Sequence, residues 1–201
     1  EEYKTIEPDD IKVIDPAMGS GHILVYAFDV LMKIYESYGY SQQDAAKSIV
    51  EKNLYGLDID NRAYQLAYFA VMMKARQYNK KILNEVTTCN VYAIQDSNDV
   101  NRDQLKYFGT GMSDIEKNTA KLQIEGLLDV FNDAKEYGSI LNVDNYDWKL
   151  IRQFVQNVDA SGQMSVDSTG IELTKELLEE LVNIGEVMAR RYDVVVTNPP
   201  Y

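Results

Sequence analysis

Cysteine, histidine and long apolar runs are scarce in this chain of 201 residues. The single Cys89 excludes an internal disulfide and a cysteine-based zinc site, so a reducing cytoplasm is the expected compartment. Only one histidine, His22, is present, and we therefore expect no histidine-rich metal centre and no metal. Apolar runs fall short of a membrane span and nothing near the start resembles a signal peptide, so we expect no membrane association.

Positive charge is also in short supply. The formal net charge is −12, and residues 101–189 hold 16 acidic against eight basic residues, which is two-thirds of that excess. So acidic a surface does not hold a nucleic-acid backbone by itself, and we expect any contacts with DNA to come largely from sequence outside these residues.

Apolar residues make up 45% of the chain, which is enough for a sizeable core.

Strand-like and helix-like segments alternate along much of the chain. Short apolar strands are predicted in 11–15, 53–60, 86–94 and 193–197, and helical periodicity is found at 21–38, 41–52 and 61–77, with Ser41 as an expected N-cap. This order predicts an α/β fold, with a parallel sheet covered by helices on both faces. The run Val194, Val195 and Val196 is expected to be a strand buried on both faces.

Three parts of the chain follow from this pattern. Residues 1–100 are expected to form the cofactor-binding half of one domain, and residues 190–201 its catalytic strand and loop. Between them, 101–189 is predicted to be a helical insertion, with helices at about 113–137, 145–158 and 172–190.

The first candidate site is the glycine-rich turn "DPAMGSG" at 15–21. In open α/β sheets, ligands bind beyond the carboxyl ends of the strands, and Asp15 stands at such an end. Gly19 and Gly21 allow a tight turn and a close approach of the backbone to a ligand. Leu24 stands where a dinucleotide fingerprint needs its third glycine, so this turn favours a ligand with a positive or hydrogen-donating end over a pyrophosphate. The alternative is a glycine turn that binds nothing.

Two further strand ends carry acids. In "GLDID" at 56–60, Asp58 is the candidate for the two hydroxyls of a ribose, whereas Asp60 is expected to cap the following helix. The alternative is that both acids serve only as caps. In the turn after the third strand, Asp96 is the candidate for an adenine amino group, and Asn98 is the alternative. A ligand with an amine-bearing tail, a ribose and an adenine fits these positions, and S-adenosylmethionine is such a ligand.

The last residues, "VVVTNPPY", hold an amide and an aromatic ring in a loop of fixed shape. Pro199 and Pro200 end the strand, because neither can donate to a sheet ladder. If the Asn198 side-chain oxygen and the Pro199 carbonyl each accept one N–H of an exocyclic base amine, its lone pair is directed at a methyl donor and no strong general base is needed. Tyr201 would stack on a base that has left the duplex.

Three motifs in this order, "DPAMGSGHIL", "LYGLDID" and "NPPY", resemble the N6-adenine DNA methyltransferases. The forms with a helical insertion before the last motif are similar to enzymes of type IIG restriction–modification and of BREX phage-defence systems. The resemblance covers roughly 11–99 and 193–201. It implies a Rossmann-like methyltransferase fold and transfer of a methyl group from S-adenosylmethionine to the N6 amine of adenine in DNA. Subunits of a defence system are the further partners that it implies.

The resemblance also implies two sets of site residues, carried over by position. The cofactor-binding set is Asp15, Pro16, Ala17, Gly19, Ser20, Gly21, Asp58, Ile59 and Asp96. The catalytic set is Asn198, Pro199, Pro200 and Tyr201.

Other functions stay open at this point. The "NPPY" motif also occurs in enzymes that methylate adenine in RNA or a glutamine amide in release factors, and a cytosine amine is a further target, although Ser in place of Asn198 is more usual there. A non-catalytic scaffold that binds partners through its acidic helices is an alternative of another class. The family's upstream cofactor segment is not recognisable in 1–10 and further strands are expected after "NPPY", so we expect a fragment of a larger enzyme that is inactive alone.

Overall fold

The structure is a computed structural model that describes residues 6–158 and 167–199. The chain divides into two units, each described here by itself. The sheet unit takes residues 1–94 and 191–201, and the helical unit takes residues 95–190. Within the described ranges, no helix has the length and apolar character needed to cross a membrane.

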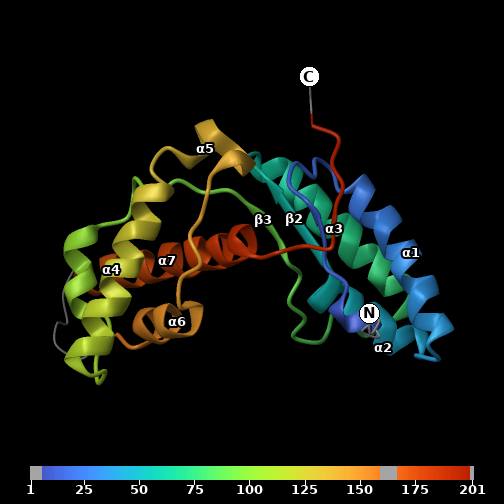
Figure 1. Cartoon of the computed structure of the whole chain (residues 1–201), viewed down its shortest axis with the longest axis horizontal. Coiled ribbons are helices and arrows are strands. Elements are labelled where there is room, and N and C mark those ends of the chain that lie inside the picture. Colours follow the sequence, from blue (N-terminus) through green and yellow to red (C-terminus); the bar gives the residue numbers. More distant parts are fainter. Residues whose placement is uncertain (1–5, 159–166, 200–201) are drawn as a thin grey trace, which may run out of the picture. The chain divides into compact units, whose positions relative to one another are not determined.

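The sheet unit is built on four parallel strands with helices between them (Figure 1). In chain order its elements are η1 (Pro8–Asp10), β1 (Val13–Asp15), α1 (His22–Ser37), α2 (Gln42–Ser48), η2 (Ile49–Asn53), β2 (Leu54–Asp58), α3 (Asn61–Tyr78), β3 (Val91–Ala93) and β4 (Val194–Val195). The strand order is β3-β2-β1-β4. The prediction of an α/β fold with a parallel sheet is therefore confirmed.

The strand register brings three strand ends to one edge of the sheet. Asp15 of β1 pairs with Gly56 of β2, and Val13 of β1 pairs with Val194 of β4. The order reverses at β1, because β2 and β3 follow on one side of it and β4 lies on the other. Such a reversal leaves a crevice beyond the carboxyl ends of the strands, which is the usual ligand site in open α/β sheets.

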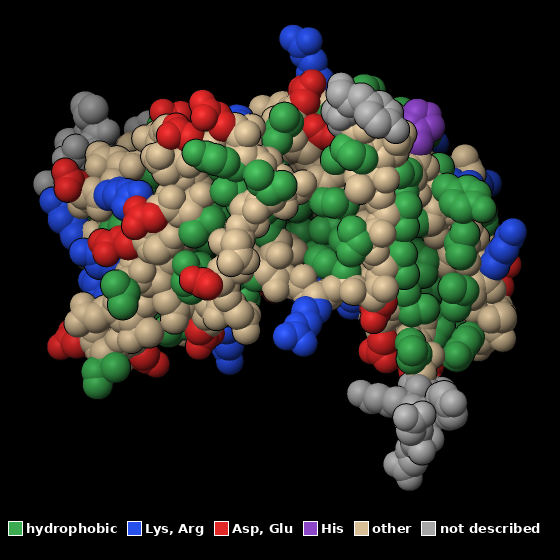
Figure 2. Space-filling model, turned by 45° about the horizontal axis from the view of Figure 1, so that its top comes forward, with side chains coloured by type: hydrophobic (Ala, Val, Ile, Leu, Met, Phe, Trp, Pro, Cys, Tyr) green, Lys and Arg blue, Asp and Glu red, His purple; other side chains and the backbone are tan. Residues whose placement is uncertain are grey.

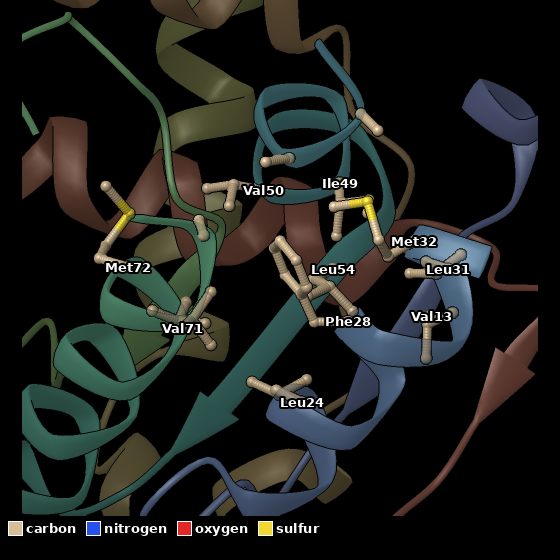
Figure 3. Packing of buried hydrophobic residues seen from close by; sticks show 14 of the residues in the cluster. Val13, Leu24, Phe28, Leu31, Met32, Ile49, Val50, Leu54, Val71 and Met72 are labelled. Atoms are coloured by element: carbon tan, nitrogen blue, oxygen red, sulfur yellow. The ribbon is translucent and has the colours of Figure 1, made fainter. Parts of the chain in front are cut away.

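Helices α1 and α3 pack together against the strands and form the core of the sheet unit (Figure 3). Leu24, Phe28 and Leu31 recur at helical spacing along α1 and are fully or almost fully buried. Val71 of α3 and Leu54 of β2 lie in the same cluster. This packing fixes the start of α1, and with it the glycine-rich turn that leads into the helix.

A polar cluster holds η1 against the opposite end of the sheet. The buried Asn53 donates from Nδ2 to the carbonyls of Pro8 and Ile11 at 2.7 and 2.8 Å. The Tyr35 hydroxyl lies 2.8 Å from Asn53 Oδ1 and 2.6 Å from a carboxylate oxygen of Asp9. These bonds anchor the segment that precedes β1.

The helical unit contains α4 (Asp114–Val130), α6 (Trp148–Gln156) and α7 (Asp167–Ala189), which pack on one another, and the short elements η3 (Arg102–Tyr107), α5 (Ala134–Tyr137) and η4 (Gly138–Ile140). Helix α4 begins with a capping box between Ser113 and Glu116. The buried core of the helical unit includes Ile124 and Leu128 of α4 and Phe154 of α6. Acidic and basic side chains are interspersed on the face visible in Figure 2.

Two predicted segments are shorter than expected. The predicted helix 113–137 is broken, because α4 ends at Val130 and Asp133 has a left-handed backbone with φ of 54° before α5 begins. Of the predicted strand 86–94, only Val91–Ala93 pairs with β2.

The expected burial of the last strand is wrong. Val194, Val195 and Val196 are 41%, 63% and 42% exposed. In the sheet of the described residues β4 is an edge strand that pairs with β1 alone, and a strand is buried on both faces only when neighbours and helices surround it. The apolar run therefore predicted the strand correctly, but its burial on both faces was predicted wrongly.

Candidate functional site

The glycine-rich turn after β1 is hydrogen-bonded to the end of β2. The Met18 N–H donates to the carbonyl of Leu57 at 2.9 Å, and the Gly19 N–H donates to Asp58 Oδ2 at 2.8 Å. Within the turn, the Gly21 N–H donates to the Met18 carbonyl at 2.8 Å. Two candidate segments whose bonded residues are 39 positions apart in sequence therefore form one structure.

The two glycines of this turn are required for different reasons. Both have left-handed backbones, with φ of 53° at Gly19 and 82° at Gly21. A Cβ atom on Gly21 would lie 2.9 Å from the Cα atom of Ala67, so this glycine lets α3 pass close to the turn. A Cβ atom on Gly19 would meet nothing within 4 Å, so the backbone there faces open space that a ligand can approach.

Asp15 closes β1 with its carboxylate almost fully enclosed, since the residue is 1% exposed. The carboxylate accepts a hydrogen bond from the Ala17 N–H at 3.1 Å. Burial raises the pKa of the Asp15 carboxyl above its usual value, and the charge of Asp58 adds to the rise, whereas the Ala17 N–H and the side chain of Thr197 act against it. A positively charged or hydrogen-donating group at this strand end would relieve the burial of the charge.

Asp58 is half-buried at the end of β2, and backbone N–H groups orient both of its oxygens. Oδ2 accepts from Gly19, and Oδ1 accepts from Asp60 at 2.9 Å. Asp60 itself is the N-cap of α3 and accepts from the Arg62 N–H at 2.8 Å, as predicted. Ile59, between the two acids, is 52% exposed.

The remaining residues of the turn are accessible. Pro16 and Ala17 are half-buried, and Ser20 is exposed. Ser20 Oγ lies 2.7 Å from His22 Nδ1, and both side chains line a hollow of about 370 Å³ between α1 and α3. The single histidine, purple in Figure 2, lies at the surface.

The catalytic candidates follow β4 at the same edge of the sheet. The Val196 N–H donates to the carbonyl of Ile14 at 3.0 Å, which extends the pairing of β4 with β1 to the start of the loop. After Thr197 come Asn198 and Pro199, which are exposed. Pro200 and Tyr201 lie outside the described residues.

Asp96 and Asn98 belong to the helical unit. Asp96 Oδ1 accepts from the Lys135 N–H at 2.8 Å, at the start of α5. Asn98 pairs with Asp133 in both directions, donating to Oδ1 at 2.7 Å and accepting from the backbone N–H at 3.0 Å. Each residue therefore orders the junction between α4 and α5 within that unit.

Sequence reasoning missed two features of this edge. Gly56 faces the turn, and a Cβ atom there would lie 2.5 Å from Met18 Sδ, so the buried Met18 occupies the space that this glycine leaves. The second is Thr197, which follows Val196 where the N–H of that residue bonds to the Ile14 carbonyl, so the chain leaves β4 beside the end of β1. The only signal for Thr197 was its place directly before Asn198, and Gly56 gave none beyond being a glycine within a strand.

The arrangement suits an organic ligand with positive and hydroxyl groups. Two carboxylates, Asp15 and Asp58, lie beside a glycine backbone open to approach, and an amide side chain follows the next strand. In the described part of the chain, no three acidic, histidine or cysteine side chains gather in a way that could hold a metal ion.

A parallel sheet with a glycine turn after its first strand, an acid at the end of the second and Asn-Pro after the last is the architecture of a Rossmann-like methyltransferase. The chain belongs to the Eco57I restriction-modification methylase family, whose sequence profile matches residues 52–201. The family expected from the three motifs is thereby confirmed.

Two curated relatives match almost the whole chain. The adenine-specific methyltransferase PglX of Lacticaseibacillus casei (strain Zhang) is 39% identical over 198 residues, which is 96% of this chain and 16% of the relative. The adenine-specific methyltransferase BrxX of Escherichia coli O9:H4 (strain HS) is 36% identical over 217 residues, covering 98% of this chain and 18% of the relative. The chain therefore spans less than a fifth of the length of either relative.

Proposed function

We propose that this chain carries the cofactor site and the target-amine loop of an enzyme that methylates the N6 amine of adenine in DNA. The donor is S-adenosylmethionine, and the setting is a restriction–modification or phage-defence system in the cytoplasm. One observation carries the proposal: the ends of β1, β2 and β4 share one edge of the sheet, where the Val196 N–H bonds to the Ile14 carbonyl and Gly19 bonds to Asp58. The names of the two relatives support the choice of adenine.

The residues at this edge fit the chemistry of the cofactor. Asp15 would hold the ammonium group of the amino-acid end, since a buried carboxylate favours a positive partner. Asp58 would accept the two ribose hydroxyls, because each carboxylate oxygen has a lone pair beyond the one used by its N–H donor. Open space at Gly19 leaves room for the ligand, and Pro16, Ala17, Ser20, Gly21 and Ile59 would line it.

Asp96 would accept from the adenine amino group of the cofactor, and Asn98 is the alternative. Asp96 uses Oδ1 for the Lys135 N–H, and its carboxylate has acceptor capacity beyond that bond. The side-chain oxygen and the side-chain nitrogen of Asn98 are both bonded to a different partner, Asp133, which favours Asp96. When bound, S-adenosylmethionine supplies an electrophilic methyl group on sulfur.

The protein acts on the target amine through alignment. The lone pair of an exocyclic base amine is delocalised into the ring, so the amine is a poor nucleophile. Asn198 Oδ1 and the Pro199 carbonyl would each accept one of its N–H groups, which localises the lone pair on nitrogen and directs it. Tyr201 would stack on the flipped base and Pro200 would keep the loop rigid. The surplus proton leaves to water after transfer, so no general base is required.

Contacts with DNA would be made mainly by parts of the protein other than these residues. The chain has a net charge of −12, and neutralising phosphates requires lysine and arginine. Partner subunits of a defence system would act in the same way, by supplying surfaces that this acidic stretch does not. Under this view the 201 residues alone do not turn over DNA.

The deciding test uses the complete gene product in a host without adenine methylation. Nucleosides from its DNA and RNA are quantified by mass spectrometry. We expect N6-methyladenine in DNA, lost in Asn198→Ala, while that variant still binds S-adenosylmethionine. Methylated adenine confined to RNA, or methylated glutamine, would replace DNA as the substrate, and persisting DNA methylation in Asn198→Ala would reject the role of the amide.

The cofactor site is tested separately by titration with S-adenosylmethionine. Asp58→Ala should lower affinity by at least about a hundredfold, since it removes a charged acceptor of two hydroxyls. Asp60→Ala is the matched control, because this acid lies two residues away and caps α3. Equal affinity of the two variants would reject the ribose role of Asp58, and absence of binding by the unaltered protein would favour a scaffold.

A further inference from the structure

Helix α3 carries an apolar stripe on its solvent-exposed side. Leu66 and Phe69 are 57% and 64% exposed, and Met73 is half-buried. The three residues follow one another at intervals of three and four, so they lie on one face of the helix. Arg62 and Arg76 are exposed and continue the same spacing at the two ends. The stripe therefore has an apolar centre and basic ends, and it runs for about 21 Å along the helix.

A hollow of about 370 Å³ lies beside this stripe, between α3 and α1. Met73 lines it from α3, and His22 and Val25 line it from α1. Tyr26 and Val30 follow His22 along α1 at intervals of four residues and are 73% and 43% exposed. Hydrophobic side chains are gathered at the surface over α1, at the right of Figure 2. The two helices thus form an apolar groove, here called the α1–α3 groove, with Tyr26 and Val30 on one side and the α3 stripe on the other.

The surroundings of the α1–α3 groove are basic, although the chain as a whole is acidic. Residues 61–84 contain five basic residues and no acidic one, whereas the net charge of the chain is −12. Lys74 is paired with Asp29 of α1 at 2.6 Å, but Arg62 and Arg76 form no ion pair within the described part of the chain. These two free charges favour an occupant whose apolar face is flanked by Asp or Glu.

The spacing of the stripe favours a helix as the occupant. Its five positions, 62, 66, 69, 73 and 76, are separated alternately by four and three residues, which is the spacing of a coiled-coil seam. A groove with such a seam receives an amphipathic helix, whose apolar residues lie against it. Nucleic acid fits less well, because aliphatic side chains such as Leu66 and Val30 occupy the exposed centre and offer nothing to phosphate.

A second copy of the chain is a poor occupant. If this face met itself, Arg62 and Arg76 would lie opposite arginines of the other copy in either helix orientation, and like charges oppose such a contact. The relatives PglX and BrxX contain far more sequence, since this chain spans 16% and 18% of their lengths. A helix of the same polypeptide also docks at a high effective concentration, so it needs little affinity of its own.

We propose that the α1–α3 groove is an interface within the complete gene product, occupied by an acidic amphipathic helix from outside these 201 residues. The occupant has about four turns, matching the stripe, with apolar residues against Phe69 and acids beside Arg62 and Arg76. It reaches His22 at the start of α1, directly after the glycine-rich turn. The rest of the protein thereby supports the helix that follows this turn. The interface goes beyond the proposed methyl transfer and does not depend on it.

The test places the photoreactive amino acid p-benzoylphenylalanine at Phe69 in the complete gene product. Irradiation should give a cross-link within a single chain. Mass spectrometry of the digest should identify a peptide outside the 201 residues, with Asp or Glu flanking apolar residues at helical spacing. The same probe at Val86 is the matched control, because Val86 is 98% exposed and follows α3 outside the groove. The probe at Val86 should not capture this peptide.

Other capture products would overturn the proposal. A product with twice the mass of the chain would assign the groove to a second copy. A cross-link to nucleic acid or to a different protein would assign the groove to that partner. The absence of any cross-link from probes at both Phe69 and Leu66 would show that the groove stays open to solvent.

Charge reversal tests the basic ends of the stripe. With the probe at Phe69, Arg62→Glu combined with Arg76→Glu should lower the yield of the internal cross-link at least about fivefold at low salt, because two attractive contacts become repulsive. Lys106→Glu combined with Lys149→Glu changes the net charge equally, on exposed residues of the helical unit, and should leave the yield within about twofold. Equal yields in the two double variants would overturn the assignment of an acidic helix. The cross-link requires no methyl transfer, so a gene product that methylates nothing would reject the proposed function and leave this test unaffected.

Discussion

Replacing Gly21 by alanine tests whether the glycine-rich turn depends on the close passage of α3. Alanine at a φ of 82° has a left-handed conformation that costs about 1–2 kcal/mol. The added Cβ atom would also lie 2.9 Å from the Cα atom of Ala67 and 3.4 Å from its carbonyl oxygen. These are backbone atoms, so α3 or the turn must shift, and such overpacking costs about 1–3 kcal/mol more.

Gly39 is a matched control for this substitution. Its φ is 83°, almost the same as that of Gly21, and a Cβ atom there would meet nothing within 4 Å. Gly39→Ala therefore carries the conformational cost without the collision. The difference between the variants should be about 1–3 kcal/mol, or roughly 2–12 °C in Tm for a chain of this size.

The assay is thermal unfolding of the 201-residue chain, followed by circular dichroism. Gly21→Ala should melt well below Gly39→Ala. Adding Ala67→Gly to Gly21→Ala should not restore stability, because the contact at 2.9 Å is with the Cα atom. Equal Tm values for the two single variants would refute the argument that α3 confines the turn.

Two further changes address buried polar groups. Asp15→Asn should raise Tm at neutral pH. Burial raises the pKa of Asp15 in the folded state, so folding favours the protonated carboxyl. The stability that the protonated form contributes is present below the ordinary pKa of aspartate and is lost as the pH rises through the pKa of the folded state. Thermal scans across this range should show the gain vanish in acid, and a gain that persists there would contradict the reasoning. Asn53→Ala leaves the carbonyls of Pro8 and Ile11 without their donor and should lower the free energy of unfolding by about 3 kcal/mol, measured in urea. A loss below about 1 kcal/mol would mean that water replaces the amide.

Local sequence patterns predicted the elements of the sheet unit because the signals for each helix or strand lie in consecutive residues. The spacing of Leu24, Phe28 and Leu31 identifies the buried face of α1, and Asp60 directly before a helical run identifies a cap. Three motifs also identified the family, since the chemistry of each motif depends on neighbours in sequence.

What the patterns could not predict depends on residues far apart. The exposure of Val195 follows from the place of β4 at the edge of the sheet that the described residues form, and the same apolar residues can occupy an edge strand or a central strand. The break before α5 follows from the left-handed Asp133, which pairs with Asn98 thirty-five residues earlier. The bond between the Val196 N–H and the Ile14 carbonyl joins residues at opposite ends of the chain.

The hydrogen bond between Gly19 and Asp58 has a consequence for the energetics of recognition. Together with the N–H of Asp60, it holds the carboxylate in one rotamer before any ligand arrives. The conformational entropy of this side chain is therefore lost during folding and does not oppose binding. A hydroxyl-bearing ligand would meet acceptors that are already oriented, and its affinity would depend on the rigidity of the turn as much as on the charge of the acid. Disturbing the turn at Gly56, where an added Cβ atom would meet Met18, should then weaken binding while Asp58 itself remains intact.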